Sequence, residues 1–286
     1  DHYGPQLIAD QMLDFVRQHQ DEPFFCYYPT LIPHLPLQVP QRFLDIYEGM
    51  WPEDPYDGTG PYGYLPHPAP RAAYAAMITF MDFQVGRLMS LLQDMGQFDD
   101  TIIFFTSDNG TTFLENQVDY EFFDSVGPLR GLKGSVWEGG IREPFIAHWP
   151  GVIEEGTVSD RQVTHYDMLA TLAGLTGADA PSTDGVSIMP TLLGQDDQQE
   201  DHEYLFWDYA GYGGQLAVRM GNWKGVKRDL MENPEAPLQL YNLEADIGEK
   251  TDIVDLHPSV ASQMEDIMVE ARTRPEFEEF RFGAYS

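Results

Sequence analysis

Apolar residues that recur every three or four positions predict helices in several parts of the chain. The clearest run covers residues 70–95, where apolar side chains fall at i, i+3 and i+4 intervals. Residues 5–19 and 164–176 show the same amphipathic spacing. Residues 258–272 begin with Pro258, which suits the first turn of a helix, and we expect them to form the last helix of the chain.

Unbroken apolar runs predict buried strands at 24–28 and 101–106. The second run ends at Ser107-Asp108-Asn109-Gly110, where the glycine permits a sharp turn. Because the helix predicted at 70–95 lies between the two runs, the pattern is that of a βαβ crossover with parallel strands. The sequence therefore predicts an α/β fold with a mixed, largely parallel sheet flanked by helices.

The character of the sequence changes after Gly194, where residues 195–201 form a charged linker. Short strand-like runs follow, separated by Gly and Pro turns at a spacing typical of an antiparallel sheet: 203–209, 215–220, 223–228 and 238–243. We therefore expect two domains. Residues 1–195 form the larger α/β domain, and residues 196–286 form a small α+β subdomain of about four antiparallel strands and a helix.

The composition narrows the classes of partner. The 286 residues include 47 acidic and 16 basic side chains, which give a net charge of −31. Such a surface repels phosphate backbones and anionic lipid, so neither nucleic acid nor a membrane is an expected partner. No apolar run approaches the roughly 20 residues that span a bilayer. Cys26 is the only cysteine, which excludes an internal disulfide and a zinc cluster built from cysteines.

Two side chains that carry oxygen donors, Asp108 and Asn109, follow the strand predicted at 101–106. Ligands of open α/β sheets bind beyond the carboxyl ends of the strands. A carboxylate beside an amide carbonyl offers two hard oxygen donors, which suit Ca²⁺ or Mg²⁺. Asp-Asn-Gly is also ordinary turn chemistry, so these residues alone leave a simple turn open as the alternative.

Two further residues could act beside this turn. His34 lies in a proline-rich segment that follows the strand predicted at 24–28, and the βαβ order places it at the same sheet edge. Lys133, between Gly131 and Gly134, could hold an anion in a chain with few basic residues. The alternatives are a histidine satisfied within its loop and a solvated loop lysine.

Other polar residues have structural explanations. Glu138 and Arg142 are four residues apart and are expected to form a structural ion pair. His165 and Asp167, at a predicted helix start, are expected to be cap and surface residues. The long loops 45–70 and 111–127 are rich in aromatic and acidic residues and either contact a substrate or pack on themselves. The sequence contains neither a Walker-type loop nor a Gly-x-Gly-x-x-Gly motif.

Three segments resemble those of the sulfatase family, part of the alkaline phosphatase superfamily. Residues 24–36 resemble its Pro-Phe-Phe…Pro-His-x-Pro segment, and Thr106-Ser107-Asp108-Asn109-Gly110 resembles its metal-binding turn. Residues 128–151 resemble its long signature, which runs from Pro-Leu-Arg-Gly-x-Lys-Gly to Trp-Pro-Gly, with Glu143 where valine is common. The resemblance covers essentially the whole chain.

This resemblance implies a sulfuric ester hydrolase that cleaves aryl or carbohydrate sulfate esters. It implies that Asp108 and Asn109 are two ligands of an active-site Ca²⁺, for which Mg²⁺ is the less favoured alternative. It implies that His34 assists at the ester oxygen or the sulfate and that Lys133 binds a sulfate oxygen and the leaving oxygen. A cation with Lys⁺ and His⁺ would stabilise the negative charge that grows on the departing oxygen.

The family's nucleophile does not occur in this sequence. It is a formylglycine made from Cys or Ser in a Cys-x-Pro-Ser-Arg segment, and Cys26 stands in a different context, before Tyr27-Tyr28. The family's N-terminal pair of aspartates and its second Lys and His are also absent. We therefore expect a C-terminal portion of a sulfatase, inactive alone, whose nucleophile comes from a segment outside this sequence.

Two other functions remain open at this stage. The chain could belong to a phosphodiester or phosphonate monoester hydrolase of the same superfamily, or be a truncated, non-catalytic binding or assembly module. A chain that lacks sheet strands would expose an apolar flank, which favours self-association. Since the family is commonly exported, a periplasmic or secreted location is expected.

Overall fold

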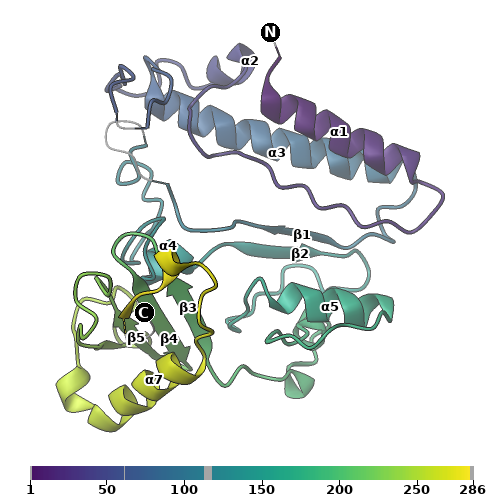
Figure 1. Cartoon of the computed structure of the whole chain (residues 1–286). Coiled ribbons are helices and arrows are strands. Elements are labelled where there is room, and N and C mark those ends of the chain that lie inside the picture. Colours follow the sequence, from purple (N-terminus) through teal and green to yellow (C-terminus); the bar gives the residue numbers. More distant parts are fainter. Residues whose placement is uncertain (1, 61, 113–117, 284–286) are drawn as a thin grey trace. The chain divides into compact units, whose positions relative to one another are not determined.

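The computed structural model describes residues 2–60, 62–112 and 118–283 (Figure 1). The chain divides into two compact units. The first unit comprises Asp1–Ile102 and Thr112–Ser125, and the second comprises Ile103–Thr111 and Val126–Ser286. The domain boundary expected between residues 195 and 196 stays a prediction.

The described residues of the first unit form the helices α1 (Gly4–Gln18), α2 (Gln41–Leu44) and α3 (Pro70–Asp94). The two long helices confirm the helices predicted from apolar periodicity. They lie side by side, and Arg87 of α3 donates a hydrogen bond of 2.8 Å to Asp10 of α1 (Figure 1).

Phe80 is the centre of the core of this unit. It is fully buried, and the rings of Tyr3 and Phe43 meet it edge to face at centroid distances of 5.2 and 5.3 Å. By length and composition alone α3 could also cross a membrane, although Asp82 and Arg87 interrupt its apolar run. Ala72, Ala76 and other residues of α3 are buried in this core.

The strand predicted at 24–28 is wrong: these residues carry no regular secondary structure. Since helix α3 is therefore not preceded by a strand, the predicted βαβ crossover does not form among the residues that the structure describes. The physical reason is that a strand needs a hydrogen-bonded neighbour. For the backbone of 24–28, the structure records one bond outside helices and strands, in which the Thr30 N–H donates to Tyr28.

In the second unit, strand β1 (Ile103–Thr106) confirms the run predicted at 101–106. Its neighbour is β2 (Phe145–His148), and the two are antiparallel, with Ile103 opposite His148 and Thr106 opposite Phe145. The strand pairing seen here is thus antiparallel, whereas a largely parallel arrangement was predicted. Helix α4 (Glu138–Ile141) lies between these two strands in the chain, whereas α5 (Asp167–Thr176) and α6 (Met189–Leu192) follow β2. Short 3₁₀ turns lie at Asp196–Gln198, Val254–Leu256 and Glu278–Phe280.

The C-terminal part forms the antiparallel sheet and helix that the sequence predicts. Strands β3 (Leu205–Tyr209), β4 (Gln215–Met220), β5 (Trp223–Lys227) and β6 (Gln239–Asn242) lie in sequence order, and α7 (Pro258–Glu270) follows them. Alternate residues face opposite sides of a strand. Leu216 and Val218 pack against the side that carries α7, whereas Ala217 packs with Val136 and Trp137. The segment that contains Lys133 is thereby attached to the second face of this sheet.

The long loop at 45–70 packs on itself and caps helix α3. Tyr56 and His67 exchange two backbone hydrogen bonds of 2.9 Å. The carboxylate of Glu53 accepts hydrogen bonds of 2.9 Å from the backbone N–H groups of Arg71 and Ala72. These N–H groups lie in the first turn of α3, where no intrahelical acceptor exists and a negative charge is stabilising.

We expect Glu53→Ala to lower the free energy of unfolding by about 1 kcal/mol, because two partly buried N–H groups lose their acceptor. Chemical denaturation followed by circular dichroism measures the change. Glu48→Ala, which removes an exposed acid from the same loop, is the control and should have an effect within about 0.5 kcal/mol. Equal losses in the two variants would contradict the capping role.

Candidate active site

The turn that follows β1 presents the predicted metal ligands to solvent. Asp108 is exposed and Asn109 is half-buried. Among the described residues, the structure records no hydrogen bond to the side-chain oxygens of either residue. An Asp-Asn pair that only closes a turn would use these oxygens on nearby backbone N–H groups. Side-chain oxygens without a recorded hydrogen bond at the end of a strand are compatible with part of a binding site for a hard cation.

Backbone contacts hold this turn on helix α4. The N–H of Gly110 donates a hydrogen bond of 3.0 Å to the carbonyl of Gly140. A Cβ atom on Gly110 would overlap the carbonyl oxygen of Gly139, so the two segments approach more closely than a side chain allows. The position of Asp108 is therefore set by α4 as well as by β1.

Lys133 is attached to the same turn. Its backbone N–H donates a hydrogen bond of 3.0 Å to the carbonyl of Thr111. Gly131 and Gly134 on either side have φ values of +84° and +86°, which glycine adopts without strain. The structure records no ion pair for the Lys133 ammonium among the described residues, and its binding of an anion stays a prediction.

One cavity of about 1240 Å³ in the second unit is lined by all three of these residues. Asp108, Asn109 and Lys133 thus line the same cavity, and their joint role as one site stays a prediction. Among the described residues, no group of three or more His, Cys, Asp or Glu side chains has the arrangement of a metal site. Asp108 and Asn109 would therefore supply only part of the six to eight oxygen ligands that Ca²⁺ takes.

Glu143 is a further carboxyl group in this cavity, and it is not among the site residues predicted from the sequence. Burial, and then the negative charge of Asp108, raise the pKa of Glu143 to about 7. Its Oε1 atom is buried and has no hydrogen-bond partner among the described residues. The departure from valine at this position was the only signal of it in the sequence.

The predicted ion pair between Glu138 and Arg142 is confirmed at 3.0 Å. His165 is exposed at the rim of the cavity, with its Nε2 atom 3.4 Å from the Thr106 hydroxyl. The surface position expected for Asp167 is wrong, because this side chain is fully buried. It accepts hydrogen bonds from the Thr164 and Val186 N–H groups and is paired with His202 at 2.8 Å, so it fixes three segments.

His34 lies in the first unit, whereas the other candidates lie in the second, so its assembly with them stays a prediction. The ring is exposed, and its Nδ1–H donates a hydrogen bond of 2.8 Å to the Leu35 carbonyl. A carbonyl can only accept, so this contact places a proton on Nδ1 and leaves Nε2 for a ligand.

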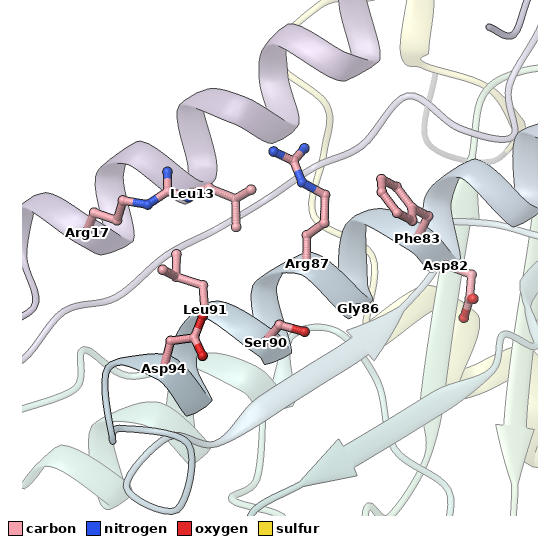
Figure 2. Close-up of a pocket in the computed structure, with 9 residues that line it drawn as sticks. All are labelled: Leu13, Arg17, Asp82, Phe83, Gly86, Arg87, Ser90, Leu91 and Asp94. Carbon is pink, nitrogen blue, oxygen red and sulfur yellow. The ribbon is translucent and has the colours of Figure 1, made fainter. Parts of the chain in front are cut away.

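A second hollow, of about 480 Å³, lies between α1 and α3 (Figure 2). Its two basic residues are already paired, Arg17 with Asp14 and Arg87 with Asp10, at 2.9 and 2.8 Å. Its other charged residues, Asp82 and Asp94, are acidic, so this hollow lacks the unpaired basic group that distinguishes the cavity at Lys133.

With this geometry established, comparisons with known proteins identify the class. The sequence profile described as Sulfatase matches residues 2–178, and a second, described as N-sulphoglucosamine sulphohydrolase, C-terminal, matches residues 132–274. The chain belongs to the sulfatase family. The predicted resemblance to the sulfatase family is confirmed, and with it the α/β fold class.

Individual relatives that match this chain are also sulfatases by name. Arylsulfatase A of Bos taurus is 33% identical over 281 residues, which cover 90% of this chain and 49% of that protein. N-acetylgalactosamine-6-O-sulfatase of Bacteroides thetaiotaomicron is 28% identical over 94% of this chain and 51% of its own length. The crystal structure of Ps i-CgsB in complex with k-i-k-neocarrahexaose matches with a TM-score of 0.75 and 28% identity, covering 94% of this chain and 55% of that chain. The chain thus spans about half the length of these relatives.

We expect Gly110→Ala to lower the free energy of unfolding of the second unit by about 3 kcal/mol, because the new methyl group overlaps backbone that cannot move aside. Denaturant titration monitored by tryptophan fluorescence measures this loss. The control is Gly86→Ala, where the added methyl group meets no atom within 4 Å in the middle of α3. It should stabilise the protein by about 0.5–1 kcal/mol. Equal effects of the two variants would disprove the close approach.

We expect Glu143→Gln to stabilise the protein at high pH. The folded pKa of about 7 exceeds the ordinary value of 4.5. The stability linked to this protonation is therefore fully present below pH 4.5 and is lost as pH rises through 7. Unfolding curves measured in EDTA should show the variant about 1 kcal/mol more stable at pH 8, after allowance for partial exposure, and equal to the parent near pH 4. A pH-independent difference would refute the raised pKa.

Proposed function

We propose that this chain supplies the metal-binding turn, the lysine and the histidine of a sulfuric ester hydrolase that acts on aryl or carbohydrate sulfate esters. The observation that carries the proposal is the shared cavity of Asp108, Asn109 and Lys133 in a member of the sulfatase family. Names of relatives that refer to aryl and N-acetylgalactosamine sulfates support both substrate classes.

Asp108 and Asn109 would hold a Ca²⁺ ion, which supplies positive charge toward a sulfate oxygen when bound. Lys133 would donate hydrogen bonds to a sulfate oxygen and stabilise the charge on the leaving oxygen. His34, with one proton fixed on Nδ1, would carry a second on Nε2 to that leaving oxygen. The remaining metal ligands and a formylglycine nucleophile would come from a segment outside this sequence. A periplasmic or extracellular location is part of the proposal.

Release of sulfate from 4-nitrophenyl sulfate and N-acetylgalactosamine 6-sulfate tests this proposal, with the chain joined to its own upstream coding sequence. We expect turnover, and a loss of about 10²–10³-fold in kcat for Lys133→Ala. Lys250→Ala, which removes an exposed lysine elsewhere in the second unit, should leave the rate unchanged.

Two results would contradict the proposal. If no sulfate were released from any of these esters, the proposed hydrolase activity would be contradicted. A strong preference for an aryl phosphodiester over the aryl sulfate would instead favour the related phosphodiester or phosphonate monoester hydrolases. The proposed metal ligand is tested separately by calorimetric titration of Ca²⁺ into the parent and into Asp108→Ala. The variant should bind Ca²⁺ with lower affinity than the parent.

A further inference from the structure

A buried group of charges joins the C-terminal sheet to helix α4. Lys224 of β5 is fully buried, and its Nζ atom lies 2.8 Å from Glu138 Oε1 and 3.0 Å from Glu249 Oε1. Both glutamates are themselves buried. A buried charge that loses its partner is strongly destabilising, so these three side chains constrain one another.

Glu138 is the member of this group that touches the site. Burial opposes its charge, but Lys224, Arg219 and Arg142 outweigh that effect and lower its pKa below the usual value. Arg219 and Arg142 contact its second oxygen at 3.4 and 3.0 Å. Glu138 is therefore held as a carboxylate at the first residue of α4 by cations on both of its oxygens.

Glu249 holds the same helix from a second direction. Its Oε2 accepts a hydrogen bond of 2.8 Å from the Glu138 backbone N–H, and its carbonyl accepts one of 2.7 Å from Arg130. It has a φ of +48°, which is unfavourable for a residue other than glycine. Such a conformation persists only where surrounding contacts impose it. The contacts of Glu249 with the segment around α4 are of this kind.

Helix α4 in turn holds the metal-binding turn, through Gly140 to Gly110, and Lys133 is bonded to Thr111. A continuous series of contacts therefore leads from the core of the C-terminal sheet to Asp108 and Lys133. All of them lie in the second unit.

We propose that Lys224 is a positioning residue: by holding Glu138 it fixes α4, and through α4 it fixes the turn of Asp108 and Asn109 and the backbone of Lys133. The C-terminal subdomain thereby becomes a structural part of the site, although its strands supply no predicted ligand. This inference concerns the rigidity of the turn and does not require the proposed reaction.

Hydrogen–deuterium exchange of the Gly110 and Lys133 amides, read by NMR on the 286-residue chain without ligands, tests this role. In Lys224→Met, which keeps a long unbranched side chain and removes its charge, both amides should exchange roughly ten-fold faster or more. Lys227→Met is the matched control, because Lys227 lies on the same strand but pairs with Glu265 at the surface. It should leave both amides unchanged.

A second control separates positioning from general loss of stability. Met264→Ala truncates a buried side chain of α7 that belongs to the apolar cluster between the sheet and α7. It should lower stability without selectively exposing Gly110 and Lys133. If exchange at these two amides instead follows global stability equally in both variants, Lys224 has no positioning role.

A milder variant covers the case in which Lys224→Met does not fold. Glu138→Gln keeps the shape of the side chain but weakens its contacts with Lys224 and Arg142. It should also accelerate exchange at Gly110 and Lys133 selectively, and unchanged exchange in a folded Glu138→Gln protein would overturn the proposal. Measured separately, failure of sulfate release with intact exchange effects would reject the proposed function alone.

Discussion

The close approach of Gly110 to the Gly139–Gly140 backbone is the constraint on which the site depends. Two segments about 30 residues apart in the sequence share a hydrogen bond where no side chain fits between them. This contact fixes the path of the chain after strand β1 (Ile103–Thr106), and thereby the backbone positions of Asp108 and Asn109. Gly139 and Gly140 are also too close to neighbouring backbone to accept a side chain, so close packing, in addition to conformational freedom, explains why glycine stands there.

A buried carboxylate stabilises that contact at an energetic cost. Hydrophobic side chains of the same volume often replace buried ion pairs without loss of stability, so packing alone does not explain Lys224 and Glu138. Charges do impose direction, because a buried ammonium must meet its carboxylates at hydrogen-bond distance. Two carboxylates around one lysine, with Arg219 and Arg142 on the outer oxygen of Glu138, restrict α4 to a narrow range of positions.

The parts that were predictable from sequence are those with local or periodic signals. Apolar spacing located α1 and α3, and turn residues located the four strands of the C-terminal sheet. The strand predicted at 24–28 failed because a strand depends on a neighbour, which an apolar run cannot specify. Likewise, the pairing of Lys224 with Glu138 joins residues 86 positions apart, and nothing in the spacing of either one indicates it.

Charge explains why the cavity would need a cation in order to hold a sulfate ester. The chain carries a net charge of −31, and Asp108 and Glu143 both contribute carboxyl groups to the cavity. Of its basic residues, Arg142 and Arg219 share Glu138, and Arg161 pairs with Asp196 and Asp201. Lys133 is the remaining Lys or Arg of the cavity lining, and the described residues contain no ion-pair partner for it. A Ca²⁺ ion on Asp108 and Asn109 would reverse this balance, since a bound divalent cation is the largest local charge in such a site. Binding of metal and of an anionic substrate should therefore be thermodynamically coupled, with each increasing the affinity for the other.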